Sequence, residues 1–182
     1  MSKLFKYDKA VNSILFSLSK LGGVTDMHKL CKILYFADQR HLSLYGRSIT
    51  GDTYIAMHYG PVPSNVDDIL KAVRGDSFFA SSNEAKPLKK YLTFDNRFMV
   101  RALVAPDMDE LSATDVKCLE YAVDLCRNKS FVELTEYSHG LAWSNTHPDR
   151  EMSVKDILRE IGEDEAYVEY IADKQRTRAA FL

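Results

Sequence analysis

The sequence predicts a mainly α-helical protein with a small β element, folded as one compact helical domain around a single long central helix. Three observations support this fold class. Apolar residues recur at helical spacing in most segments, residues 27–45 contain no Gly or Pro, and the polar triplet Asp95-Asn96-Arg97 separates two extended runs. At 182 residues the chain can bury about 70% of its unfolded surface, so its core needs no disulfide or metal.

A glycine pair separates the first two predicted helices. The apolar pattern that begins at Ala10 ends at Gly22-Gly23, which is typical of a left-handed helix C-terminus. We expect Thr25 to be the N-cap of the central helix, while Asp26 favours the positive end of the helix dipole. Gly46 is expected to end this helix.

Strand, turn and capping patterns predict the remaining elements. After the central helix we expect a short strand at 53–59, a proline turn at 60–63, a helix that begins with the capping box of Ser64 and Asp67, and a surface loop at 74–86. A β-hairpin of 90–94 and 98–104 should follow. The C-terminal half should contain three helices, capped by Ser112 with Asp115, Ser130 with Glu133 and Ser153 with Asp156, and a last helical segment from 163 toward 180. The helix that Ser130 opens is expected to run to Trp143.

The central helix is apolar over more than half of its circumference, so we expect the rest of the domain to surround it. The apolar arc includes one face made of Leu30, Ile33, Leu34, Ala37, Leu44 and Tyr45. Its predicted solvent-facing residues are His28, Lys29, Lys32, Gln39 and Ser43, with Arg40 at the edge. Phe36 falls within this polar arc. It therefore either contacts another segment of the chain or belongs to a partner-binding patch.

Two polar residues, Asp38 and His41, fall inside the apolar arc, and their spacing of three makes them neighbours on one helix face. A buried carboxylate needs a charged or hydrogen-bonding partner, which His41 or Arg47 could supply. We interpret Asp38 and His41 as a structural polar pin that ties the helix to the following loop. The alternative is a catalytic acid–base pair or half of a metal site.

The predicted partner-binding surface combines Phe36, Arg40 and Arg47 with His58 and Tyr59 of the short strand. An aromatic anchor beside arginine is the usual composition of an interface hot spot. Further along the chain, His139 and Trp143 stand about one helical turn apart. We expect this pair to pack at a helix junction, and the alternative is that it borders a binding cleft.

A series of short motifs accompanies these residues from the central helix to the only tryptophan. In chain order they are Lys29–Asp38, His41-Leu42, Tyr45-Gly46, Ile49–Asp52, Tyr54–Met57, His58–Pro63, Leu111-Ser112, Ser138-His139 and Trp143. Together they resemble the Panacea domain, also called the SocA-like antitoxin domain, of bacteria and their phages. The resemblance implies a mostly helical antitoxin that binds and neutralises a protein toxin, usually one encoded nearby. It supplies no settled set of functional residues.

The resemblance spans about residues 10–143. We therefore predict a Panacea/SocA-like domain at 1–147 and a C-terminal helical extension at 148–182, packed on or beside it. The expected function is neutralisation of a cognate toxin by direct stoichiometric binding. One alternative is an adaptor that delivers a bound toxin or other partner to a cellular protease. A second is a DNA-binding regulator, since two helices followed by a hairpin superficially suggest a winged helix-turn-helix.

Other function classes are disfavoured by composition. The net charge of −2 gives no general attraction to nucleic acid, so nucleic acid is an unlikely partner. No nucleophile, metal-ligand or phosphate-loop motif occurs, so we expect no catalytic residues, no metal, no cofactor and no enzymatic activity. Cys31, Cys118 and Cys126 are expected to be buried thiols. With no signal peptide or apolar span evident, a cytoplasmic location without membrane contact is expected.

Overall fold

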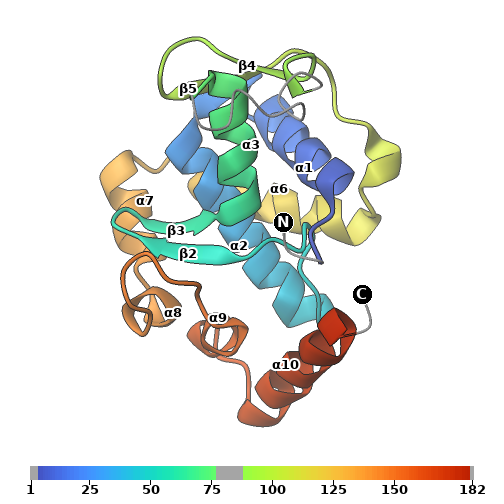
Figure 1. The fold of residues 1–182 in the computed structure, drawn as a ribbon, viewed down its shortest axis with the longest axis vertical. Helices are drawn as coiled ribbons and strands as arrows, with labels where there is room; N and C mark the ends of the chain where they lie inside the picture. The colour runs from blue at the N-terminus through green and yellow to red at the C-terminus, as the bar shows by residue number, and fades with distance from the viewer. Residues whose placement is uncertain (1–3, 77–87, 181–182) are drawn as a thin grey trace.

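The computed structural model describes residues 4–76 and 88–180, apart from the side chains of residues 178 and 179 (Figure 1). The fold is mainly helical with small antiparallel sheets, which confirms the predicted class. The elements are α1 (Tyr7–Lys20), β1 (Val24–Asp26), α2 (Met27–Tyr45), β2 (Tyr54–Met57), β3 (Gly60–Pro63), α3 (Ser64–Arg74), β4 (Leu92–Phe94), β5 (Met99–Ala102), a short 3₁₀ turn η1 (Met108–Glu110), α6 (Ala113–Arg127), α7 (Phe131–Ser138), α8 (Leu141–Ser144), α9 (Val154–Glu160) and α10 (Glu165–Ala180).

Helix α2 runs through the centre of the molecule and contacts α1, α3, α6, α7 and α9 (Figure 1). Its N-cap is Asp26, whose carboxylate accepts a hydrogen bond from Lys29 N at 2.7 Å. The prediction of Thr25 as N-cap was wrong, because Thr25 pairs with Val100 in a sheet. Gly46 ends α2 as predicted, in the left-handed conformation with φ of 64°.

The solvent-facing side of α2 was predicted incorrectly. Lys32 and Gln39 are buried, whereas Leu44 and Tyr45, assigned to the apolar arc, are exposed. The reason is long-range: strand β3 covers Lys32, and segments after residue 130 cover Gln39 and its surroundings. Glu160 of α9 accepts hydrogen bonds from Gln39 Nε2 at 2.8 Å and from Tyr35 Oη at 3.0 Å, and α7 covers the adjoining part.

Two antiparallel sheets flank this helix. The predicted hairpin forms β4 and β5, and β1 adds to β5 to give the order β1-β5-β4. The predicted proline turn is instead strand β3, which pairs with β2 so that Pro63 lies opposite Tyr54. Proline is tolerated here because such short strands lie at sheet edges. The actual turn is at His58-Tyr59, between the two strands.

Two of the four predicted capping boxes are present in the structure. The boxes at Ser112 and Ser130 are both present. Ser64 makes no such box; Asp52 of the preceding loop instead accepts hydrogen bonds from the first N–H groups of α3. Ser153 caps α9 by accepting from Lys155 N, without the predicted contribution of Asp156.

Two further predictions concern segment boundaries. The helix expected to run from Ser130 to Trp143 breaks at His139-Gly140 into α7 and α8. Most of the predicted loop at 74–86 falls outside the described residues. Its beginning is the end of α3 at Arg74, where Gly75 takes a left-handed conformation.

The C-terminal extension shares the core of the rest of the chain. Its buried residues Ile157, Leu158, Val168 and Ile171 belong to the same apolar cluster as the residues of α2. The backbone at 149–152 runs along β2: Ala56 N donates to Arg150 O at 2.9 Å and Met152 N donates to Tyr54 O at 2.7 Å. The boundary at residue 147 stays a prediction.

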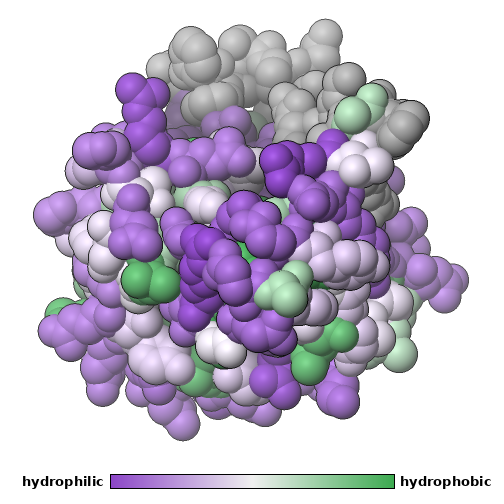
Figure 2. Space-filling view, turned by 90° about the horizontal axis from the view of Figure 1, so that it is seen from below, coloured by the Kyte–Doolittle hydropathy of each residue, from purple (hydrophilic) through white to green (hydrophobic). Residues whose placement is uncertain are grey.

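The end of the molecule at which α10 lies is mostly hydrophilic, with apolar residues in small separate patches (Figure 2). Within the described part of the chain, no helix is long and apolar enough to cross a bilayer. The three cysteines are buried free thiols, as expected.

Candidate functional site

Asp38 ties α2 to the loop that follows it. Its carboxylate is buried and accepts hydrogen bonds from Ile49 N at 2.6 Å, Thr50 Oγ1 at 3.0 Å and Tyr54 Oη at 2.8 Å. Burial raises the pKa of this carboxyl, and the three donors act against that rise. The geometry supports the interpretation as a structural pin. The expected partners were wrong, because neither His41 nor Arg47 bonds to Asp38.

His41 and Arg47 instead meet at Asp115, the third residue of α6. The buried Asp115 carboxylate lies 3.1 Å from His41 Nε2 and 3.1 Å from Arg47 Nη2, and Lys9 of α1 donates to its other oxygen. His41 Nδ1 lies 2.8 Å from the carbonyl oxygen of Arg47. Burial would raise the pKa of Asp115, but hydrogen bonds from His41, Lys9 and Ser112 outweigh it and hold the pKa well below its usual range.

Phe36 is not on the surface. It is only 4% exposed, and its ring packs edge-on against Tyr35 and Tyr137 at centroid distances of 5.3 Å. It contributes to the lining of a depression of about 310 Å³, beside which the Arg40 guanidinium stacks 4.0 Å from the Tyr121 ring. The prediction of Phe36 as an exposed anchor was therefore wrong, since it belongs to the core.

The residues grouped as one partner-binding surface thus lie in three places. Phe36 and Arg40 adjoin the depression, Arg47 bonds to Asp115, and His58 with Tyr59 forms the turn between β2 and β3. This turn lies beside α7 (Figure 1), and strand β3 contacts that helix. The depression has two exposed rings, those of Tyr121 and Tyr137, and the third place carries a larger group of aromatic rings that contact one another.

We call this group the hairpin–α7 surface: His28, His58, Tyr59, Phe131 and Val132. Tyr59 is 53% exposed and Phe131 is 47% exposed, with ring centroids 5.1 Å apart. His28 stacks on Phe131 at 4.1 Å, and His58 contacts Tyr59 at 4.6 Å. Val132, which follows Phe131 in α7, is also exposed. Four rings from three separate segments therefore form one continuous surface.

A buried lysine supports this surface from below. Lys32 is completely buried and donates from Nζ to Pro61 O of β3 at 2.9 Å. Burial lowers the pKa of Lys32 to about 8. Gly60, with φ of 91°, lies directly over it, and a Cβ there would collide with Ser138 Oγ and come within 2.9 Å of Lys32 Nζ. The close approach of β3 to α2 therefore requires glycine at this position.

Two histidines flank the lysine. His28 Nε2 lies 3.2 Å from Tyr59 O, and burial together with the positive charge of Lys32 lowers the pKa of His28 to about 4. His139 stacks flat on Trp143 with ring centroids 3.7 Å apart, and Trp143 Nε1 donates to Met57 O at 2.9 Å. His28 Nδ1 and His139 Nε2 are buried without a hydrogen-bond partner among the described residues.

His139 and Trp143 thus lie where α7 and α8 meet the β2–β3 hairpin. Trp143 fixes the end of β2 through Met57, and burial is the largest cause lowering the pKa of His139. Both residues adjoin the hairpin–α7 surface. Their position is therefore compatible with both alternatives, packing at a helix junction and bordering a binding site. Which of the two matters for function stays a prediction.

The sequence reasoning missed Lys32, His28 and Phe131 as parts of this site. The sequence could have indicated that His28 and Lys32 lie together, because residues spaced by four share a helix face. Phe131 gave no local signal, because its neighbours come from α2 and the hairpin. The exposed groups of this site are mainly aromatic rings. Among residues 4–76 and 88–180, no group of three His, Cys, Asp or Glu side chains could hold a metal ion.

Comparison with known proteins agrees with the motifs. The family described as "Antitoxin SocA-like, Panacea domain" matches residues 30–144, which is more than half of the 182 residues. No curated protein and no solved structure matches the chain. The matched segment includes α2 from Leu30 onward, the β2–β3 hairpin, α7 and α8, and hence all of the hairpin–α7 surface except His28. The chain belongs to the SocA-like antitoxin family and carries its Panacea domain.

Proposed function

We propose that this protein neutralises a cognate protein toxin by direct stoichiometric binding, and that the hairpin–α7 surface makes the contact. Membership of an antitoxin family implies a toxin partner. The observation that carries the choice of surface is the continuous group of exposed rings around Tyr59 and Phe131. Contiguous exposed apolar groups of this kind mark interaction sites, and aromatic residues dominate interface hot spots.

The support beneath the surface favours tight binding. The turn backbone is held by His28 at Tyr59 O, by Lys32 at Pro61 O and by Trp143 at Met57 O. Rings attached to such a fixed backbone lose little conformational freedom on binding, which lowers the entropic cost of association. The buried polar groups act on binding through this positioning and do not need to touch the partner.

Arg40 and Arg47 take lesser roles in this proposal. Arg40 lies beside the depression lined by Tyr121 and Tyr137, where it can extend the contact along α7. Arg47 is committed to its ion pair with Asp115 of α6. Phe36 is not part of the proposed toxin contact, because its side chain is buried in the core.

The DNA-binding alternative has little support from the geometry. A recognition helix must present one face to the major groove. Helix α2 stands at the position such a helix would take, but its residues from Leu30 to Gln39 are all buried. The protease-adaptor alternative involves the same binding step, followed by loss of the partner when a protease is present.

The test is titration of the purified protein into an assay of the toxin encoded beside it. Protection should be complete near one antitoxin per toxin. Tyr59→Ala and Phe131→Ala should each weaken binding by at least about tenfold, or ~1.4 kcal/mol, with melting temperatures close to wild type. The matched control is Tyr170→Ala, because Tyr170 is 59% exposed on α10, outside the surface.

Three results would contradict the proposal. Protection of many toxin molecules by one antitoxin would indicate an enzyme. Protection that needs an added protease would indicate the adaptor. Equal weakening by Tyr170→Ala, or normal binding by both surface variants, would show that the contact lies elsewhere.

A further inference from the structure

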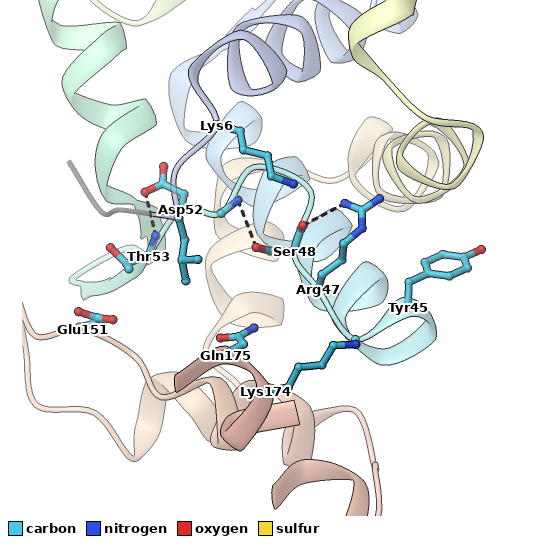
Figure 3. Close-up of a pocket in the computed structure, with 12 residues that line it drawn as sticks. Lys6, Tyr45, Arg47, Ser48, Asp52, Thr53, Glu151, Lys174 and Gln175 are labelled. Carbon is cyan, nitrogen blue, oxygen red and sulfur yellow. Dashed lines mark hydrogen bonds between the residues drawn. The ribbon is translucent and has the colours of Figure 1, made fainter. Parts of the chain in front are cut away.

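Several polar groups of the cavity beside the loop after α2 already have partners. This cavity has a volume of about 370 Å³ and lies between the N-terminal leader, the loop and α10 (Figure 3). Arg47 donates to Ser48 O at 3.3 Å and is paired with Asp115, while Asp52 Oδ1 accepts from Thr53 N at 2.8 Å. The titratable groups under the β2–β3 hairpin are arranged differently.

Four side chains hold the backbone of the hairpin at its turn and at the start of β3. In order along the hairpin, Trp143 Nε1 donates to Met57 O at 2.9 Å, His139 bonds to the backbone of His58, His28 Nε2 lies 3.2 Å from Tyr59 O, and Lys32 Nζ donates to Pro61 O at 2.9 Å. Three of these four side chains can gain or lose a proton. The position of the turn therefore depends mainly on titratable groups.

Both histidines hold the turn in their neutral form. Tyr59 O can only accept a hydrogen bond, so His28 carries its proton on Nε2 and leaves Nδ1 as an acceptor. Within the described part of the chain, His28 Nδ1 and His139 Nε2 are buried and have no hydrogen-bond partner. A second proton on either ring would create a buried donor without an acceptor, which is costly.

The surrounding charges also oppose a second proton. Burial is the largest cause that lowers the pKa of His28 and of His139, and the positive charge of Lys32 is the next. The acid that acts on His28 in the opposite sense is Asp26, whose carboxylate already caps α2. The other titratable or charged groups on the elements packed here are Cys31 and Cys126, which act on Lys32, His58 of the turn, Lys29, which donates to Arg127 O, and Glu133, which is bound in the capping box of Ser130.

We propose that protons regulate the hairpin–α7 surface: the neutral imidazoles of His28 and His139 hold the turn, and their protonation releases it and weakens toxin binding. This inference rests on the proposed function, because it concerns regulation of the same surface. Release of the turn separates Tyr59 from Phe131, on which His28 stacks, and so breaks up the group of contacting rings.

The direction of the effect follows from linkage. A released histidine regains a pKa of about 6.5, whereas the pKa of His28 in the held turn is about 4, so the released turn takes up protons as the pH falls below 6.5. Between about pH 7.5 and pH 5, His28 alone shifts the ratio of held to released turn by about 25-fold. The surface is therefore complete at neutral pH and is lost in mild acid.

The release can be measured without a partner, as hydrogen exchange of the amides of residues 54–63 in the full chain. After correction for the intrinsic pH dependence of exchange, their protection should fall at least about fivefold between about pH 7.5 and pH 5, while the amides of α2 keep theirs. Unchanged protection of residues 54–63 in the wild type would overturn the inference, and this comparison needs no variant.

The matched variant combines His28→Gln with His139→Asn, which keep amide donors near the two backbone sites but cannot take up a proton at this pH. Its hairpin protection should fall by less than about twofold over the same range, and a fall equal to that of the wild type would also overturn the inference. The control is His147→Gln, which removes an exposed histidine outside the surface and should behave as the wild type.

The toxin arm measures the Kd of the toxin encoded beside this protein at the same two pH values. The wild-type Kd should rise at least about fivefold at about pH 5, and that of the double variant by less than about twofold. Tyr59→Ala, measured at about pH 7.5, keeps the two proposals apart. Normal binding by Tyr59→Ala refutes the proposed contact surface, whereas weakened binding by Tyr59→Ala together with a pH-independent wild-type Kd refutes control by protons alone.

Discussion

Replacing Asp115 by Asn should lower the free energy of unfolding by about 2–3 kcal/mol at pH 7. Breaking one side of a buried ion pair costs about 3–5 kcal/mol, because the remaining charge loses its compensation. Here the two cations that would be left, Lys9 and Arg47, are 17% and 31% exposed and can reach water, which reduces the loss. Asn also keeps an acceptor for Ser112 N, so the cap of α6 survives.

The pH dependence gives this prediction a second readout. The pKa of Asp115 is held well below its usual value of 3.8, so its contribution is complete above that value and is lost progressively as the pH falls from there toward the lower pKa of the folded state. Wild-type stability should therefore decline between about pH 5 and pH 2, and the Asp115→Asn variant should lack this part of the decline. Asp38 and Asp52 have raised pKa values and contribute with the opposite sign.

Urea denaturation followed by circular dichroism at several pH values measures both effects. The control is Asp124→Asn, which removes a 75% exposed carboxylate from the same helix and should change stability by less than about 0.5 kcal/mol. A loss below about 0.5 kcal/mol for Asp115→Asn at pH 7, or an unchanged acid slope, would refute the account of Asp115 as the joint between α1, α2 and α6.

Three further predictions follow from the core and the hairpin. Phe36→Ala should destabilise by about 3–5 kcal/mol in urea denaturation, because it empties a packed site, and a near-neutral result would return Phe36 to the surface. Gly60→Ala should reduce soluble yield and melting temperature through collision with Ser138, whereas Gly75→Ala, where a Cβ meets no neighbour, serves as control for backbone strain alone. Lys32 has a pKa lowered to about 8, so the folded state holds fewer protons and stability should rise from pH 8 toward pH 9 by up to about 1 kcal/mol. Lys32→Met should abolish that rise in urea titrations, and an equal rise in the variant would assign it to another group.

The sequence predicted best the features that depend on neighbours in the chain. The extent of α2, its end at Gly46 and the capping boxes at Ser112 and Ser130 all arise from residues within a few positions of one another. Helical periodicity and capping are local physics, so they can be read without knowing the tertiary fold.

The features that failed depend on segments far away in the chain. Lys32 looked exposed because nothing local indicates that Pro61 O will lie 2.9 Å from its ammonium group. Asp38 lacks its expected partners for the same reason: His41 and Arg47 lie close to Asp38 in sequence, but the packing of α6 against α2 places them at Asp115. Side-chain pairing in a core follows packing, which no local pattern determines.

The backbone bonds between residues 149–152 and β2 couple the C-terminal part of the chain to the hairpin. Ala56 N donates to Arg150 O and Met152 N donates to Tyr54 O, so both bonds lie on the outer edge of the strand that leads into His58 and Tyr59. Because both are main-chain bonds, side-chain substitutions at Arg150 or Met152 leave them in place, whereas removal of the segment would leave this edge of β2 without them. The support of the hairpin therefore includes a segment that lies outside the matched family residues 30–144.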